Sequence, residues 1–342
     1  MTTTIAVDAM SGDRGTEVTV PASLSILRKD KALKLLLVGD VEKIKEELGD
    51  YSDVAQRVEI QAASEIVEMD EPPALALKKK KDSSMRVAID MVKAERAQAA
   101  VSAGNTGALM ATSRFVLKMI PGLKRPAICG ELPTLSGHVR MLDLGANVEC
   151  GPDMLRQFAI MGSVLASEVD GIEEPSIGLL NIGAEDIKGS EVVKQASKLI
   201  ADSGLNYHGY VEADEIYSGR VDVIVSDGFS GNVSLKTSEG VAKFIMGVMR
   251  EEFAKNLITK LVALIALPIM RAAGMRMDPR RYNGASLLGL RGTVVKSHGG
   301  ADVLAFECAI TDAAKQAKMS VPDRISAAVE RQLESFESQT SS

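Results

Sequence analysis

Short apolar runs alternate along the chain with longer segments in which apolar residues recur every three or four positions. The runs consist mainly of aliphatic residues and end at Gly, Asp or Asn, which is typical of buried strands followed by turns. This alternation is characteristic of βαβ units, so it predicts an α/β fold around a largely parallel sheet. We expect strands at residues 4–8, 35–38, 58–60, 99–102, 139–144, 177–181 and 222–226.

The segment 83–93 illustrates the helical pattern. Its Ser pair can cap the start of a helix. Its apolar residues then fall on one helical face: Met85, Ile89 and Val92.

No low-complexity linker interrupts the chain, so we expect one compact unit with subdomains over residues 1–330. This unit includes a helical protrusion over residues 240–282. A solvated tail is expected over residues 331–342, where polar residues dominate.

The composition of the 342 residues excludes several classes of function. With 46% hydrophobic and 25% charged residues, the chain resembles a soluble globular protein. Its net charge is −6 and Trp is absent, which disfavours a nucleic-acid binder, because such proteins carry a basic surface and aromatic stacking platforms.

Three features predict a cytoplasmic location. The three cysteines are widely spaced and form no CxxC pair, which indicates a reducing compartment and argues against structural zinc. The N-terminus lacks the pattern of a signal peptide. The longest uncharged apolar stretch, residues 261–270, is shorter than the roughly 20 residues that cross a bilayer, so we expect no membrane span.

Two Gly-rich segments, residues 100–109 and 223–235, each run from a strand into a turn and a helix. Such turns lie at the carboxyl ends of strands, where glycines let the backbone approach an anion and a helix start favours its charge. Two tight turns that merely cap helices would look the same. Neither segment matches a Walker A loop or GxGxxG, so a nucleotide is not indicated. The candidate anion-binding residues of the first turn are Gly104, Asn105, Thr106 and Gly107.

Further polar turns add candidates. Asp8 and Asp13 follow the first strand and could orient a Lys or Arg or hold a metal, although a strand-end turn residue and an N-cap are equally good interpretations. Lys188 follows another strand and is well placed for an anionic substrate, unless it is an ordinary surface lysine. Ser297 and His298 also lie in a Gly turn, but neighbours on a strand point to opposite faces, which disfavours a Ser–His relay.

Nucleophilic catalysis is weakly supported. The chain has three histidines and no GxSxG elbow, and none of its cysteines lies in a Gly-rich strand-to-helix turn. A covalent acyl-enzyme is therefore disfavoured.

Eight ordered blocks resemble the bacterial acyl-ACP:phosphate acyltransferases, the PlsX family, over nearly the whole chain. They are VDAMSGD (7–13), KKKDSSM (79–85), SAGNTGALM (102–110), DLGAN (143–147), GLLNIGAEDIKG (178–189), VSDGFSGNVSLKTSEG (225–240), NGASLLGL (283–290) and VVKSHG (294–299).

The resemblance implies a Rossmann-like αβα sandwich, similar to isocitrate and isopropylmalate dehydrogenases, and a homodimer. It implies transfer of a long acyl chain from acyl carrier protein to inorganic phosphate for phospholipid synthesis, by direct attack on the thioester and without a metal or cofactor. A membrane glycerol-3-phosphate acyltransferase would use the product. The chain departs from the family's GGDHG motif, because Ser11 and Arg14 replace Gly and His. Arg14 retains the charge for an anion contact but not the proton-transfer capacity of His.

This chemistry assigns roles to the candidates. Lys188 and Asn232 are the predicted catalytic donors to the carbonyl oxygen, together with the amides of the 104–107 turn. The phosphate-binding set is completed by Asp13, Arg14, Ser297 and His298.

Two surfaces are predicted for partners. One is a locally basic run that would dock the acidic carrier protein, and it consists of Arg271, Arg276, Arg280 and Arg281. The alternative is that this run is only a solvated face. An apolar helical stripe opposite Lys255 and Lys260 would contact the membrane surface, or instead a dimer mate: Leu257, Ile258, Leu261, Leu264 and Ile265.

Three other functions remain open. A phosphotransacetylase acting on acetyl-CoA would share the anion-binding turns but would need no acyl-chain groove. A decarboxylating dehydrogenase rests on fold analogy alone and would need a metal-binding carboxylate cluster. A non-catalytic membrane-surface scaffold would bind membranes without forming acyl-phosphate.

Overall fold

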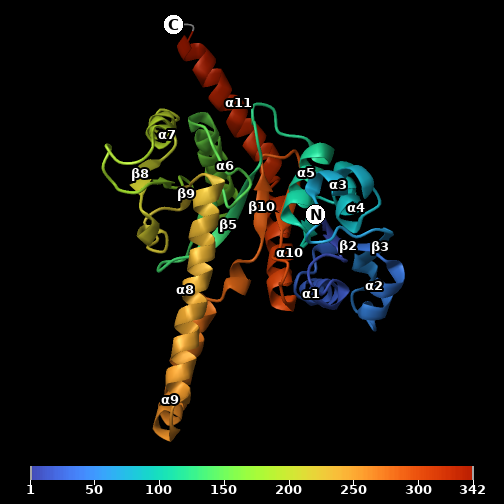
Figure 1. Ribbon diagram of the computed structural model, residues 1–342. Helices are drawn as coiled ribbons and strands as arrows, with labels where there is room; N and C mark the ends of the chain where they lie inside the picture. Colours follow the sequence, from blue (N-terminus) through green and yellow to red (C-terminus); the bar gives the residue numbers. More distant parts are fainter. Residues whose placement is uncertain (1, 341–342) are drawn as a thin grey trace.

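A mixed sheet of eleven strands forms the centre of the molecule (Figure 1) in this computed structural model, which describes residues 2–340. Its order is β3-β2-β1-β4-β11-β10-β5-β6-β9-β7-β8. The strands are β1 (Thr3–Asp8), β2 (Leu33–Gly39), β3 (Val58–Ala62), β4 (Ala99–Ser102), β5 (Ala127–Pro133), β6 (His138–Leu142), β7 (Ile177–Leu180), β8 (Tyr207–Val211), β9 (Val223–Val225), β10 (Ala285–Leu288) and β11 (Thr293–Lys296).

Strand direction divides the sheet into two halves. Strands β1, β2, β3, β4 and β11 run parallel to one another. Strand β10 is antiparallel to β11 and to β5, and β5 is antiparallel to β6. Strands β6, β7, β8 and β9 are again mutually parallel. The carboxyl ends of β1, β4 and β11 therefore lie at one edge of the sheet, and those of β6, β7 and β9 at the opposite edge.

Successive residues of a strand point to opposite faces of the sheet. Because the strands carry apolar side chains on both faces, helices cover both. Ala6 packs with Met85 of α4, whereas Ile5 and Val7 pack in another core with Ile310 of α10. A third core beneath β6, β7 and β9 contains residues of α6 and α11. The helices are α1 (Thr16–Lys29), α2 (Val41–Leu48), α3 (Pro73–Lys79), α4 (Ser84–Lys93), α5 (Thr106–Leu117), α6 (Pro152–Asp170), α7 (Glu191–Ala201), α8 (Gly228–Ala254), α9 (Leu257–Arg276), α10 (Val303–Lys318) and α11 (Val321–Thr340), with short 3₁₀ turns η1 (Ala55–Arg57), η2 (Ala213–Glu215) and η3 (Pro279–Tyr282).

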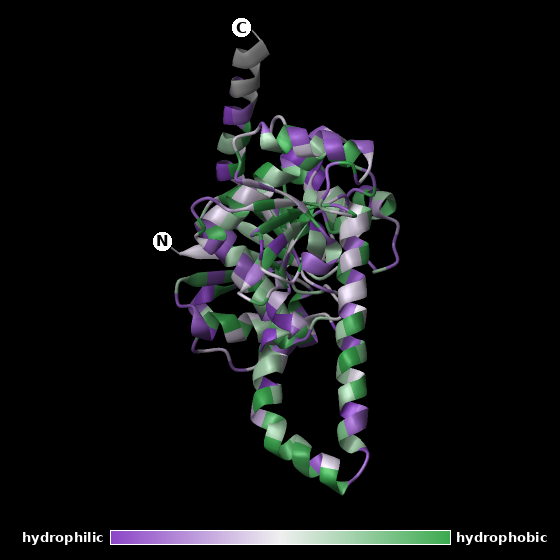
Figure 2. Cartoon of the chain, turned by 90° about the vertical axis from the view of Figure 1, so that its left-hand side faces the viewer, coloured by the Kyte–Doolittle hydropathy of each residue, from purple (hydrophilic) through white to green (hydrophobic). Residues whose placement is uncertain are grey.

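Helices α8 and α9 form an arm that extends away from the body (Figures 1 and 2). Its apolar side chains are exposed in the single chain, including Phe244 at 70% and Leu257 at 84% of their surface. By length and composition alone, Leu257–Tyr282 is long and apolar enough to cross a bilayer, and none of it is buried. The expectation that this region is too short to span is therefore not supported by this criterion.

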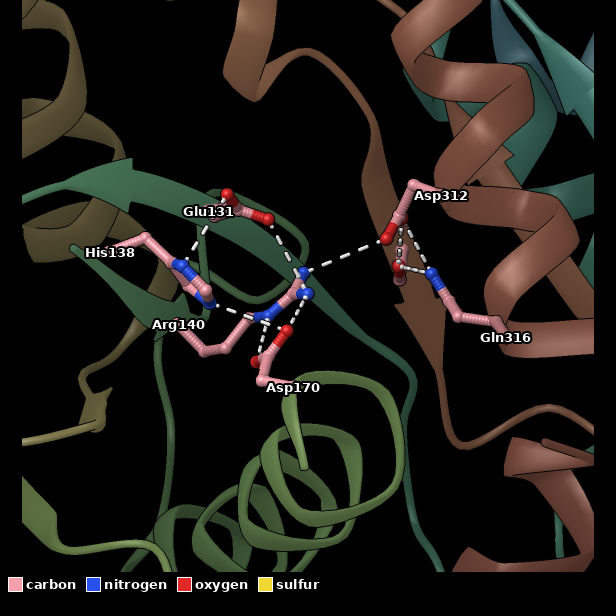
Figure 3. Close-up of polar contacts among 7 residues, drawn as sticks. Glu131, His138, Arg140, Asp170, Asp312 and Gln316 are labelled. Carbon is pink, nitrogen blue, oxygen red and sulfur yellow. Dashed lines mark hydrogen bonds and ion pairs between the residues drawn. The ribbon is translucent and has the colours of Figure 1, made fainter. Parts of the chain in front are cut away.

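A buried group of charged side chains joins the two halves of the sheet (Figure 3). The Arg140 guanidinium on β6 donates to both carboxylate oxygens of Asp170 at 2.9 and 2.7 Å, and lies 3.8 Å from the Asp312 carboxylate on α10. His138 on β6 and Glu131 on β5 complete its surroundings. This group, the Arg140 cluster, links α10 to the strands and helix of the other half.

The predicted strands all appear, as β1, β2, β3, β4, β6, β7 and β9, and so does the helix at 83–93, where Ser83 accepts a hydrogen bond from the Arg86 N–H. Strand β11 is the apparent strand that precedes the Gly turn of Ser297 and His298, whereas β5, β8 and β10 were not predicted, and the antiparallel β5 and β10 make the sheet mixed at its centre. Residues 331–340 continue α11, and residues 341–342 of the expected tail lie outside the described residues.

Candidate active site

Three polar side chains lie in a row across neighbouring strands at one edge of the sheet. Asp8 ends β1, Ser102 ends β4 and Lys296 ends β11, and all three side chains are buried. The strand register pairs Lys296 with Ser102, and the Ser102 hydroxyl donates to the Asp8 carboxylate at 2.7 Å. The Lys296 ammonium donates to the backbone carbonyls of Ala103, at 3.2 Å, and Ser297. We call this row the lysine cluster.

Burial shifts both charges of the lysine cluster toward neutrality. Burial raises the pKa of Asp8 to about 6, although the hydrogen bond from Ser102 opposes the shift. Burial lowers the pKa of Lys296 to about 8, although the carboxylates of Asp13 and Asp8 oppose that shift. At pH 7 both groups remain mainly charged. Asp8 and Asp13 thus influence Lys296 through their charge, whereas its hydrogen bonds go to the carbonyls of Ala103 and Ser297.

The turn after β1 lies against the turn after β11. The Asp13 N–H donates to the Gly299 carbonyl at 2.9 Å, and both turns line a small pocket with the exposed Arg14. Asp13 does not cap α1, because Gly15 occupies the N-cap position. The alternative interpretation of Asp13 as an N-cap is therefore wrong.

The turn after β4 presents backbone donors rather than the Asn105 amide. Asn105 accepts from the Ala108 N–H at 2.9 Å as the cap of α5 and donates to the carbonyls of Met69 and Glu71. Its side chain is thus fully used within the protein. The N–H groups of Thr106 and Gly107, exposed in the first turn of α5, have no acceptor within the helix and can receive an anion.

Close packing explains why each of the two positions in this turn is a glycine. A Cβ on Gly104 would lie 2.7 Å from the Met85 side chain, and one on Gly107 would lie 2.7 Å from the Pro73 ring. A larger residue at Gly107 would therefore disturb Pro73 first, so it is a poor test of anion binding.

Ser297 and His298 have different surroundings. The buried Ser297 hydroxyl accepts a hydrogen bond from the Asn283 amide at 2.8 Å. The exposed His298 accepts from the Gly300 N–H through Nδ1 at 3.0 Å. They do not hydrogen-bond each other in the described structure, in keeping with the argument against a relay.

The DLGAN loop, residues 143–147, supports the start of α8. Asp143 accepts hydrogen bonds from the N–H groups of Ile128, Ala146 and Asn147 and from the Asn147 amide. Burial nevertheless raises its pKa. The Gly228 N–H donates to the Asn147 carbonyl at 2.7 Å, so the first turn of α8 lies directly on this loop.

Asn232 lies one turn into α8 and is exposed. It lies beside Gly145, because a Cβ built on that glycine would be 3.5 Å from the Asn232 side chain. Gly231 allows this approach, because any side chain there would overlap the Asp143 carbonyl. The exposed Asn232 side chain therefore lies over Gly145 of the DLGAN loop.

Lys188 ends the loop after β7. Its side chain is exposed and lies across Gly183, and among residues 2–340 it has no ion-pair partner. Because β7 is the neighbour of β9, the Lys188 loop and the Asn232 helix start at the same edge of the sheet.

The structure thus separates the predicted site residues into two groups at opposite strand ends. Asp13, Arg14, the 104–107 turn, Ser297 and His298 gather around the lysine cluster, whereas Lys188 and Asn232 share the other edge. Helix α5 starts in the first group with a neutral cap, Asn105, whereas α8 starts in the second with Asp227. The phosphate dianion is therefore better accommodated at the start of α5 than at the start of α8.

The thiols do not offer a nucleophile. Burial raises the pKa of Cys129 and of Cys150 to about 12 and also raises that of Cys308. Across the part of the chain that the structure describes, no three His, Cys, Asp or Glu side chains form a group that could hold a metal.

Comparison with known proteins agrees with the motifs over the full length. A family model described as a fatty acid synthesis protein matches residues 3–324. The phosphate acyltransferase of Nitrosococcus oceani is 55% identical over 331 residues, which cover 96% of this chain and 97% of that protein. That of Alkalilimnicola ehrlichii is 54% identical and the match covers 98% of both chains. The chain belongs to the phosphate acyltransferase family. It is an acyltransferase, and the resemblance carried by the eight sequence blocks is confirmed.

Solved structures share the fold of this family member at low sequence identity. A phosphotransacetylase from Streptococcus pyogenes aligns with a TM-score of 0.61 at 17% identity, covering 93% of this chain and 94% of that one. A 4-hydroxythreonine-4-phosphate dehydrogenase from Klebsiella pneumoniae aligns with a TM-score of 0.53 at 10% identity, covering 94% and 100%. The predicted Rossmann-like α/β class is confirmed at this level.

The arginines predicted to dock a carrier are partly neutralised in this acyltransferase. Arg280 pairs with Asp278 at 2.7 Å and with Asp302 at 2.8 Å, and Arg276 donates to the Leu135 carbonyl. Arg271 and Arg281 are exposed. The run is therefore less positive in the folded protein than its sequence indicates.

Lys296 is the residue that motif reasoning missed in this family member. The signal lay in the apolar run at residues 293–296, where the period of two places Lys296 on the same buried face as Val294. A lysine at the end of a buried strand must have its charge compensated, which marks it as a candidate for a polar site.

Proposed function

We propose that this acyltransferase forms acyl-phosphate from a long-chain acyl carrier protein thioester and inorganic phosphate. A phosphate oxygen attacks the carbonyl carbon, the C–O bond forms as the C–S bond breaks, and the carrier thiolate leaves and takes up a proton from solvent. Full-length membership of the phosphate acyltransferase family is the observation that carries this proposal. The open first turn of α5 beside the lysine cluster supports a phosphate site.

The proposed division of labour follows the two groups of residues. The N–H groups of Thr106 and Gly107, with Arg14, bind phosphate, and the buried lysine cluster holds the surrounding turns. Lys188 and Asn232 stabilise the negative charge that develops on the carbonyl oxygen, a task for which one aimed donor contributes about 3–4 kcal/mol. Because the phosphate and the oxyanion donors must both reach the same carbonyl, the proposal requires the first turn of α5 and the residues Lys188 and Asn232 to come together around the bound thioester.

We infer that the fold belongs to the isocitrate and isopropylmalate dehydrogenase subclass of αβα sandwiches. The antiparallel strands β5 and β10 between two parallel halves support this subclass, as does the likeness to a phosphotransacetylase and a phosphate-ester dehydrogenase.

The test of function is a panel of donors. The protein is incubated with phosphate and either long-chain acyl carrier thioesters or acetyl-CoA, and the products are identified by mass. Acyl-phosphate from the long-chain carrier supports the proposal. Acetyl-phosphate as the main product would favour a phosphotransacetylase, and no product from any donor would favour a scaffold.

We expect Lys296→Met to raise the phosphate KM at least tenfold. Without the ammonium, the buried carbonyls of Ala103 and Ser297 lose their shared donor, at a cost of about 1–3 kcal/mol each, and the turns that they lead into shift. Phosphate saturation curves measure KM and kcat separately, and the rise of the melting temperature with phosphate measures binding without turnover.

The control for this prediction is Lys34→Met, which removes an exposed lysine from β2. If Lys296→Met folds and keeps both the parental phosphate KM and the parental thermal shift, the lysine cluster does not support the phosphate site.

We further propose that the protein is a cytoplasmic homodimer that associates peripherally with the membrane and passes its product to a membrane glycerol-3-phosphate acyltransferase. The exposed apolar residues of the arm support a membrane contact, because acyl-phosphate is poorly soluble and its consumer lies in the bilayer. A dimer mate covering the same residues is the competing arrangement.

The double substitution Leu261→Asp/Ile265→Asp separates these arrangements. Both side chains are exposed in the single chain, so we expect vesicle binding to fall at least tenfold while the dimer and its activity with a soluble donor persist. Vesicle sedimentation and light scattering measure the two properties. Dissociation of the dimer with retained folding would show that the stripe packs on a second copy.

A further inference from the structure

The surface formed by α3, α4 and α5 is strongly basic although the chain as a whole is acidic. The segment 78–118 contains nine Lys or Arg residues and three Asp or Glu residues, whereas the whole chain carries −6. The three helices lie together on one side of the molecule (Figure 1), so this excess charge is gathered in space as well as in sequence.

Internal ion pairs account for only part of this charge. Lys80 pairs with Glu71, Arg86 with Asp90 and Arg96 with Glu59. Six exposed cations of this segment have no ion-pair partner among the described residues: Lys78, Lys79, Lys81, Lys93, Arg114 and Lys118. These six, with Phe115, are called the α3–α5 face.

An exposed aromatic ring lies within this charge. Phe115 leaves 54% of its surface exposed, the Arg86 guanidinium lies 5.4 Å from its ring centre, and the Lys118 ammonium lies 4.8 Å from it. An aromatic ring flanked by cations is the kind of anchor that protein interfaces favour, because aromatic and Arg side chains supply most binding hot spots.

The α3–α5 face adjoins the proposed phosphate site. The segment leading into α3 accepts hydrogen bonds from the Asn105 amide at the Met69 and Glu71 carbonyls, and Pro73 packs on Gly107. A partner seated on α3 therefore lies beside the first turn of α5, where the phosphate is proposed to bind.

We propose that the α3–α5 face docks an acidic protein. This inference rests on the proposed function, which makes that protein the carrier that delivers the acyl thioester. The unpaired cations fit a negatively charged partner, and such complementarity mainly accelerates encounter in a salt-dependent way. The arginines near η3 are a weaker candidate, because Arg280 is already paired twice. Most of the exposed large apolar residues lie on the arm, whereas the helices of this face expose only Leu75 and Phe115, which disfavours a membrane on this face.

The test compares two charge reversals of equal size. Lys79→Glu/Lys81→Glu changes the face, and Lys31→Glu/Lys34→Glu changes two exposed lysines around the start of β2 as the matched control. We expect the first variant to lower kcat/KM for a long-chain acyl carrier about tenfold at low salt and to weaken its salt dependence. The control variant should keep the parental kcat/KM and salt dependence with the acyl carrier. With a carrier-free acyl-pantetheine donor, both variants should have the parental kcat/KM.

Other outcomes overturn the docking assignment. An unchanged carrier kcat/KM and salt dependence would show that the face is only solvated, and an equal loss with the carrier-free donor would show damage to the site. Loss of binding to anionic vesicles, with the carrier kinetics intact, would assign the face to a membrane. If the parent makes no acyl-phosphate from any carrier thioester, the proposed function fails instead. Lys79→Gln/Lys81→Gln, expected to show a smaller loss in the same direction, keeps the test available if the Glu variant folds poorly.

Discussion

Replacement of Lys188 or Asn232 by alanine is expected to lower kcat for acyl-phosphate formation by about 100-fold or more, the usual effect of removing one donor to a developing oxyanion. Both side chains are exposed and neither is used to hold the fold: Lys188 has no ion pair among the described residues, and Asn232 leans on Gly145. The free energy of unfolding should therefore change by less than about 0.5 kcal/mol.

Lys198→Ala is the matched control, because Lys198 is an exposed lysine on α7, the helix that follows the Lys188 loop. Steady-state rates with saturating phosphate and carrier thioester, together with urea unfolding, provide the two readouts. If either catalytic variant turns over within about twofold of the parent, its side chain does not act in the chemical step. A rise in KM with an unchanged kcat would assign the side chain to substrate binding instead.

The sequence pattern predicts those parts of the fold whose strands are continuous apolar runs. The central residues of β1, β2 and β4 are buried and apolar, at positions 5–7, 35–38 and 99–101, so these runs are conspicuous. Strand β5 instead contains Gly130, Glu131 and Pro133, and β8 contains His208 and Gly209. Their stability comes from pairing with neighbouring strands, which no local pattern records.

The candidate site, like the fold, could be predicted from the sequence only where the signal is local. The sequence locates the turns, because Gly and small polar residues after a strand are a local signal. It does not show which atoms of a turn remain available. The Asn105 amide is used by a segment more than 30 residues away, and Gly107 is required by Pro73. The opposite direction of the two halves, which separates Lys188 from the 104–107 turn, depends on the long-range pairing of β5 and β10.

Removal of Arg140 is expected to cause the largest loss of stability. In the Arg140 cluster, the guanidinium is 2% exposed and compensates the carboxylates of Asp170, Glu131 and Asp312 (Figure 3). Arg140→Met keeps much of the volume but removes the guanidinium from three largely buried carboxylates and leaves only the His138 imidazole beside two of them, Glu131 and Asp170. Breaking a buried pair in this way lowers the free energy of unfolding by about 3–5 kcal/mol. Urea unfolding at pH 7 measures the loss.

Arg156→Met is the control for the loss of a largely buried arginine outside the cluster: Arg156 pairs with Asp153, which is itself partly exposed. A smaller loss is expected there, because water can solvate Asp153. If the two substitutions destabilise the protein equally, the special position of Arg140 between the two halves contributes nothing.

The pH dependence separates lost charge pairing from lost packing. Burial raises the pKa of Asp170, but the hydrogen bonds from Arg140 and His138 outweigh it and hold the value at about 2. Because the folded pKa lies below the unfolded one, this contribution is complete above pH 4 and is lost as the pH falls toward 2. In Arg140→Met, only His138 still opposes the effect of burial, so the folded-state pKa of Asp170 rises and Asp170 takes up a proton at a higher pH than in the parent. The difference in unfolding free energy between parent and variant should therefore shrink by about 1 kcal/mol or more between pH 5 and pH 3. A difference that stays constant over this range would show that Arg140 stabilises the junction by packing and not by its charge.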